Sequence, residues 1–104
     1  MENRWRGEVA LTIDGQPHRM KLTLGALAEL EDDLAEPSLM ALVQRFEGAG
    51  FSTRDVLALL SAGLRGGGVE MDPDVLAHAD IEGGPMRAAQ AAAELLARAF
   101  VVAS

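Results

Sequence analysis

The side chains able to do chemistry are few and are widely spaced. His18 and His78 are the two histidines, and neither has a nucleophile motif close to it in the chain. Cysteine is absent, which excludes disulfide bonds, thiolate zinc sites and a thiol nucleophile. The spacings His-x₃-His and His-Glu-x-x-His, which place two zinc ligands on one helix face, do not occur. We therefore expect a protein that is not an enzyme and that needs no metal and no other cofactor.

Two other motifs resemble ligand sites but fit local structure better. The pairs of acids in Asp72-Pro73-Asp74 and Asp80-Ile81-Glu82 lack the twelve-residue calcium loop with its central glycine, and helix capping explains the first pair. Arg65-Gly66-Gly67-Gly68 lacks the Gly-Lys-Ser/Thr ending of a phosphate loop and follows a helix rather than a strand. We expect a helix terminator there, with a hinge between helices as the alternative.

The charge balance argues against nucleic acid as a partner. The 104 residues include 16 acids and 9 bases, for a net charge of −7. Helices expected at 39–47 and 53–65 could suggest a helix-turn-helix, but the second offers Arg54 and Arg65 as its cations, one at each end. The apolar middle of that helix has almost nothing to contact a base edge, so we expect no DNA binding.

The acids concentrate on one side of the first expected helix. Leucines at helical spacing define an apolar stripe, and the other face carries carboxylates without a base among them. A solvated face is the simplest interpretation, and an acidic docking surface is the alternative; a catalytic carboxylate pair has no substrate site to support it. For the docking surface, the candidate partner contacts are Glu29, Asp32 and Asp33.

A β-hairpin is expected in the first quarter of the chain, over residues 5–24. The larger apolar residues alternate at Val9, Leu11 and Ile13, and again at Met20, Leu22 and Leu24. Period two predicts strands with one buried face, here over 8–14 and 18–24, joined by the turn signal of residues 14–17.

The helical part is expected over residues 25–104. Apolar residues recur at helical spacing through 25–35, 39–47 and 53–65. Ser52-Thr53-Arg54-Asp55 resembles a capping box, and Asp72-Pro73 predicts the start of a short helix over 73–79. A long alanine-rich helix should follow over 85–102. We predict an α+β, mainly α fold: one domain, 1–104, with a hairpin packed on a bundle of four to five helices.

Two further candidate contact sites come from apolar residues. Leu95, Leu96 and Phe100 are large residues on a last helix whose alanines suit close helix packing, so they could meet a partner or a second copy. Completion of this chain's own core is the other interpretation. Trp5 lies between two arginines ahead of the hairpin, where it could pack locally or anchor a partner.

The residue patterns near both ends of the sequence also favour a cytoplasmic protein. The apolar stretch near the C-terminus is interrupted every four residues by Gln90, Glu94 and Arg98, which is typical of an amphipathic helix rather than a membrane span. Residues 1–8 contain two arginines but no apolar segment follows them, so we expect no secretory signal.

Several segments together resemble one known family, over most of the chain and in the right order. They are residues 5–9, 22–31, 51–57, 60–66 and 81–84, of which Leu-Thr-Leu-Gly-Ala-Leu-Ala-Glu-Leu-Glu is the most specific. The pattern is similar to the small gene-transfer-agent tail protein family of α-proteobacteria, which is related to phage tail assembly chaperones.

The resemblance implies a role without catalysis in tail morphogenesis of a phage-like particle. It implies a chaperone that holds the tape-measure or tail tube protein until the tail polymerises. Members are also labelled tail tube proteins, so a structural tube component is an alternative. A small regulatory adaptor domain is a further alternative. The resemblance transfers no catalytic residues, and a tube subunit would be expected to have more β-sheet than one hairpin.

Overall fold

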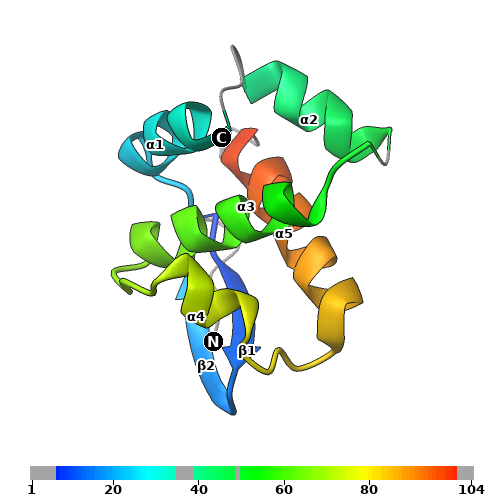
Figure 1. Cartoon of the computed structure of the whole chain (residues 1–104). Helices are drawn as coiled ribbons and strands as arrows, with labels where there is room; N and C mark the ends of the chain where they lie inside the picture. Colours follow the sequence, from blue (N-terminus) through cyan, green and yellow to red (C-terminus); the bar gives the residue numbers. More distant parts are fainter. Residues whose placement is uncertain (1–6, 35–38, 49, 101–104) are drawn as a thin grey trace.

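The computed structural model describes residues 7–34, 39–48 and 50–100. It confirms an α+β, mainly α fold in which a two-stranded antiparallel hairpin precedes five helices (Figure 1). The elements in chain order are β1 (Val9–Ile13), β2 (Gln16–Met20), α1 (Leu24–Leu34), α2 (Leu39–Glu47), α3 (Thr53–Gly66), α4 (Pro73–Ala77) and α5 (Gly84–Phe100).

The hairpin turn is tighter than the sequence suggested. Asp14 and Gly15 both have positive φ, 50° and 78°, and Ile13 pairs with Gln16 across them. A two-residue turn of this kind matches the twist of the strands and suits an Asp-Gly pair. Because the turn needs only two residues, β2 begins at Gln16, and the prediction of a strand over 18–24 is wrong in its bounds.

The apolar alternation of the first strand is confirmed, while that of the second fails at its end. Val9, Leu11 and Ile13 are all buried, and so is Met20 opposite Val9. Leu24, however, is 87% exposed and begins α1.

Thr23 explains why the chain turns into a helix at Leu24. Its Oγ1 accepts a hydrogen bond from the Ala26 N–H at 3.1 Å, which satisfies one of the free donors at the start of α1. Ala26 and Leu30 then form the buried face of the helix. Thr23 therefore caps α1, and the predicted inward position of Leu24 is wrong.

Helix α3 lies at the centre of the molecule and contacts α1, α4, α5 and β2 (Figure 1). The predicted capping box starts it. The Asp55 N–H donates to Ser52 Oγ at 3.1 Å, and the Ser52 N–H donates to Asp55 Oδ2 at 2.9 Å. The start of the central helix is therefore fixed by its own first turn.

The carboxylate of Asp55 also ties α2 to α3. Asp55 is 1% exposed, and its Oδ1 accepts a hydrogen bond from Arg45 Nη2. Next to this ion pair, the rings of Phe46 and Phe51 stack with centroids 4.6 Å apart. A buried carboxylate is expensive unless it is paired and hydrogen-bonded, and both conditions are met here.

The glycines at the end of α3 are a packing requirement. A Cβ on Gly66 would lie 1.8 Å from the Lys21 carbonyl oxygen, and one on Gly67 would lie 2.1 Å from that of Arg19. The end of α3 therefore rests directly on the backbone that leaves β2. The expected helix stop is confirmed, and close contact with the hairpin explains why Gly66 and Gly67 have no side chain.

Helix α5 completes the core by packing on α3 and β1. Its buried alanines allow the close approach that the sequence indicated, and Leu95 fills the space beside Gly63. The buried apolar residues form one cluster drawn from every element: Val9, Leu11, Ile13, Met20, Ala26, Leu30, Leu42, Val56, Leu59, Leu60, Ala62, Leu64, Leu76, Ala88, Ala91, Ala92, Leu95 and Leu96.

We predict that Gly66→Ala and Gly67→Ala each lower the free energy of unfolding by about 2–3 kcal/mol, because the new methyl group forces backbone apart. Urea denaturation followed by circular dichroism measures the change. Gly25→Ala is the matched control: it lies in the exposed first turn of α1 with room for a Cβ. It should leave stability unchanged or raise it by about 0.5–1 kcal/mol. Equal stability of all three variants would contradict the packing role and favour a hinge.

Candidate protein-binding surface

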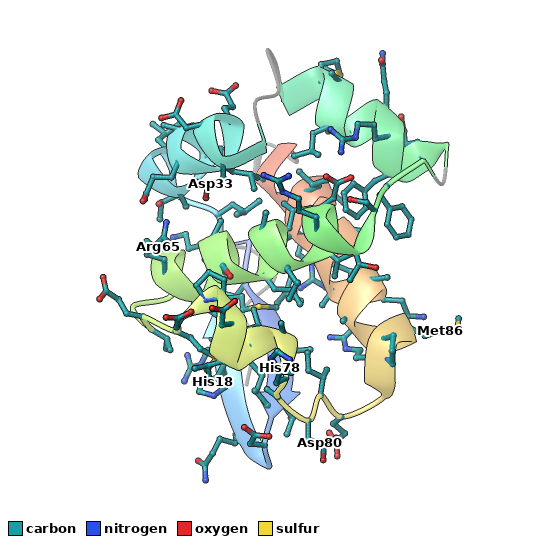
Figure 2. All side chains as sticks on the ribbon, viewed as in Figure 1. His18, Asp33, Arg65, His78, Asp80 and Met86 are labelled. Carbon is teal, nitrogen blue, oxygen red and sulfur yellow. The ribbon has the colours of Figure 1, made fainter. Side chains whose placement is uncertain are left out.

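The polar residues that could do chemistry do not gather into a catalytic or metal-binding set in the described part of the chain. His18 lies on β2 and His78 follows α4, where His78 Nδ1 is 2.9 Å from the Asp74 carbonyl oxygen (Figure 2). Within residues 7–34, 39–48 and 50–100, no group of three or more metal-ligating side chains occurs. Asp72 caps α4 by accepting from the Asp74 N–H at 2.8 Å, as its sequence motif predicted.

An apolar groove with a volume of about 470 Å³ lies in the helical half of the molecule. Its walls come from the first half of α3, from α4 and the loop after it, and from the first turns of α5. We call it the α3–α4–α5 groove. Its lining residues are Phe51, Thr53, Val56, Leu57, Leu60, Leu76, Ala77, Ala79, Asp80, Ile81, Gly84, Pro85, Ala88 and Ala89. Ligand sites in proteins commonly have this size and this apolar character.

The packing of α4 explains why the groove stays open. This helix has only five residues, and Leu76 is its one buried side chain. A single anchor holds α4 against α3, while the small residues Ala77 and Ala79 leave space between α4 and α5. The depth of the groove follows from small side chains on its walls.

The predicted acidic face of α1 is present, but one of its members is already paired. Glu29 Oε2 accepts a hydrogen bond from Arg65 Nη1 at 2.7 Å, so a base from α3 reaches a face that has none of its own. Asp32 and Asp33 are exposed, and Figure 2 shows Asp33 on α1 and Arg65 near the end of α3. The pair is partly exposed, where such a bridge contributes little, about 0–1 kcal/mol.

Leu95 and Leu96 are not surface residues. They are 0% and 3% exposed and belong to the core of this chain. The structure therefore supports the interpretation that these leucines complete this chain's own core, because α5 packs this face against α3 and β1. Phe100 ends α5, and its side chain lies outside the described part, as does the whole of Trp5.

The outer edge of β1 is covered by the chain itself. In an antiparallel pair, alternate residues direct their backbone groups away from the partner strand. Three successive carbonyls on this edge accept hydrogen bonds: Glu8 from Arg98 Nη1, Ala10 from Arg87 Nη2 at 2.7 Å, and Thr12 from the Glu82 N–H at 3.0 Å.

The turn end of the same edge is closed by residues 80–82. The Asp14 N–H donates to the Asp80 carbonyl at 2.7 Å, and the Asp80 N–H donates to Asp14 Oδ1 at 2.8 Å. Ile13 and Ile81 form an isolated antiparallel bridge. An exposed strand edge is a template for pairing with another chain, and here arginines of α5 and the loop before it occupy that template.

The second edge of the hairpin is obstructed as well. Pro17 in β2 has no N–H to donate, and the Lys21 N–H donates to the Gly63 carbonyl at 2.9 Å. The Arg19 carbonyl faces Gly67. Extension of this two-stranded sheet by a further chain would require α3 or α5 to move.

Sequence reasoning did not find the groove or the covered edges. Leu57, Ala77, Ala89 and Arg87 were not singled out as site residues from the sequence. The shortness of the helix after Asp72-Pro73 was the available signal, because a short helix next to small residues cannot fill the space beside a long one. The carbonyl partners of Arg87 and Arg98 depend on tertiary geometry that no local spacing encodes.

These features define a small α+β, mainly α protein with an apolar groove in its helical half. Among the described residues, no helix is long and apolar enough to cross a membrane. A family model described as phage tail tube protein, GTA-gp10, matches residues 6–101. The chain belongs to this family, which is a family of phage tail proteins and not of enzymes. No curated protein and no solved structure matches the chain.

We predict that Arg87→Met lowers the free energy of unfolding by about 1–2 kcal/mol and speeds amide exchange along β1. The methionine keeps the apolar stem of Arg87 but removes the donor to the Ala10 carbonyl. Arg54→Met, at an exposed position of α3, is the matched control and should change neither quantity. Hydrogen exchange measured by NMR checks the effect, and unchanged exchange at residues 9–13 would contradict the role of Arg87 at this edge.

Proposed function

We propose that this protein acts, without catalysis, in the tail morphogenesis of a phage-like gene transfer agent particle, as a tail assembly chaperone. It binds an apolar segment of another tail protein, the tape measure or the tail tube protein, and releases it when the tail polymerises. Membership of the phage tail tube protein, GTA-gp10 family supports the tail context. The observation that supports a binding role is the α3–α4–α5 groove, which has mostly apolar walls.

The closed hairpin edges favour a chaperone over a tube subunit. A tube built by strand addition needs an open edge on each side of the subunit sheet. Here the carbonyls of β1 are bonded to Arg87, Arg98 and Glu82, and β2 contains Pro17. A chain that protects its own edges can stay apart from the growing tube while it carries a partner.

A structural component of the tail tube is the second candidate function. The description of the family favours it, since that description names a tail tube protein. In that case the chain remains in the particle and contacts further copies of itself. Opening of the β1 edge by displacement of Arg87 would then be part of incorporation.

Particle composition distinguishes the two functions. For a chaperone, we expect the protein to co-purify with the tape-measure or tube protein from producing cells and to be absent from purified mature particles. Quantitative mass spectrometry of both fractions measures this. Many copies per mature particle would instead establish a structural component. Failure to co-purify with either tail protein, together with absence from particles, would contradict both functions.

A further inference from the structure

The charges around the α3–α4–α5 groove have one dominant sign. Among the described residues that line it, Asp80 is the only charged one, and none is a base. Exposed Asp74 precedes the lining residues of α4. Glu82, which follows the lining residue Ile81, lines a neighbouring hollow together with Arg87. Arg54, next to Thr53, is the opposing charge on α3. The groove is therefore apolar inside and acidic along its α4 side.

The size and walls of the groove suit the side chains of a helix. A volume of about 470 Å³ accepts the few large side chains that one face of an amphipathic helix presents at positions i, i+3, i+4 and i+7. Its floor consists of side chains from three helices, such as Leu57, Leu76 and Ala88, and offers no open strand edge. A partner in extended conformation could not add to the hairpin there, because none of the described lining residues belongs to β1 or β2.

The charge of the whole chain argues against a second copy as the occupant. Two copies that each carry a net charge of −7 repel one another, and the acidic side of the groove would add to this repulsion. A partner with positive side chains beside its apolar face is attracted instead. Charge complementarity thus selects a different protein.

We propose that the α3–α4–α5 groove binds an amphipathic helix of a partner protein, with aliphatic side chains in the groove and lysine or arginine facing Asp74 and Asp80. This assignment rests on the proposed function, for which it specifies the chemistry of the bound segment. The aliphatic side chains supply most of the affinity, and the basic side chains select the orientation.

The test uses the full chain and a synthetic helical peptide with leucines on one face and lysines on the other. Fluorescence anisotropy of the labelled peptide measures its affinity. A second peptide has glutamates in place of the lysines. We expect the lysine peptide to bind, its affinity to fall as salt is raised, and the glutamate peptide to bind at least about tenfold more weakly.

Two pairs of variants locate the binding site. Ala77→Arg places a bulky cation on the α4 wall and should weaken binding of the lysine peptide by more than about tenfold. Ala28→Arg makes the same change on the exposed face of α1 and should leave binding of this peptide unchanged. The double variant Asp74→Asn with Asp80→Asn should weaken binding of the lysine peptide by about fivefold. Asp32→Asn with Asp33→Asn removes the same charge from α1 and should not. Circular dichroism verifies that all variants are folded.

Several outcomes would overturn this proposal. They are no binding of the lysine peptide, equal binding of the glutamate peptide, or equal loss in the α1 control variants. The proposed function fails separately. If Ala77→Arg still co-purifies with the tape-measure or tube protein as well as the native chain does, the groove assignment is wrong and the chaperone function stands. If the native chain co-purifies with neither, the chaperone function is wrong whatever the peptide result.

Discussion

The fold depends on one close contact, that between the second half of α3 and the backbone that leaves β2. Gly66 and Gly67 lie against the Lys21 and Arg19 carbonyls, where a Cβ would be at 1.8 and 2.1 Å. One helical turn earlier, the Gly63 carbonyl accepts the Lys21 N–H, and a Cβ there would meet Leu95 at 2.7 Å. Three positions without side chains thus set the distances from α3 to the hairpin and to α5. Since protein interiors are close-packed, the other elements must adjust to these distances.

The positions of α4 and α5 follow from this contact. With α3 held against the hairpin, α5 lies close enough for Arg87 and Arg98 to reach the carbonyls of β1. The loop before α5 pairs with Ile13, and α4 is anchored only by Leu76. The result is a sheet whose edges are occupied and a helical half with an apolar groove. Both properties agree with our proposal that this member of a phage tail protein family binds another tail protein.

Local patterns in the sequence predicted the helices and strands well. They did not predict which of these elements pack against one another. The alternation in β1, the Ser52–Asp55 capping box and the Asp72-Pro73 helix start are each encoded within a few residues, and all three are present. Leu24 was assigned to a strand because it continues the alternation from Met20, but the cap at Thr23 overrides that pattern.

Tertiary contacts explain the remaining differences. Periodicity identifies an apolar face but not what covers it, so Leu95 and Leu96 could be assigned to this core only once α3 was in place. The pairing of Glu29 with Arg65 joins residues far apart in the chain. The groove depends on the absence of large side chains at Ala77 and Ala79, and small residues give a weak signal in any sequence pattern.

We propose that this chain holds another tail protein in the α3–α4–α5 groove. Hydrogen–deuterium exchange of the native chain, alone and in its complex with the co-purified tail protein, tests this proposal. We expect slower exchange on binding in residues 56–60, 76–81 and 84–89, with the acidic face of α1 unchanged. Slower exchange confined to α1, or to the outer edge of β1, would contradict it.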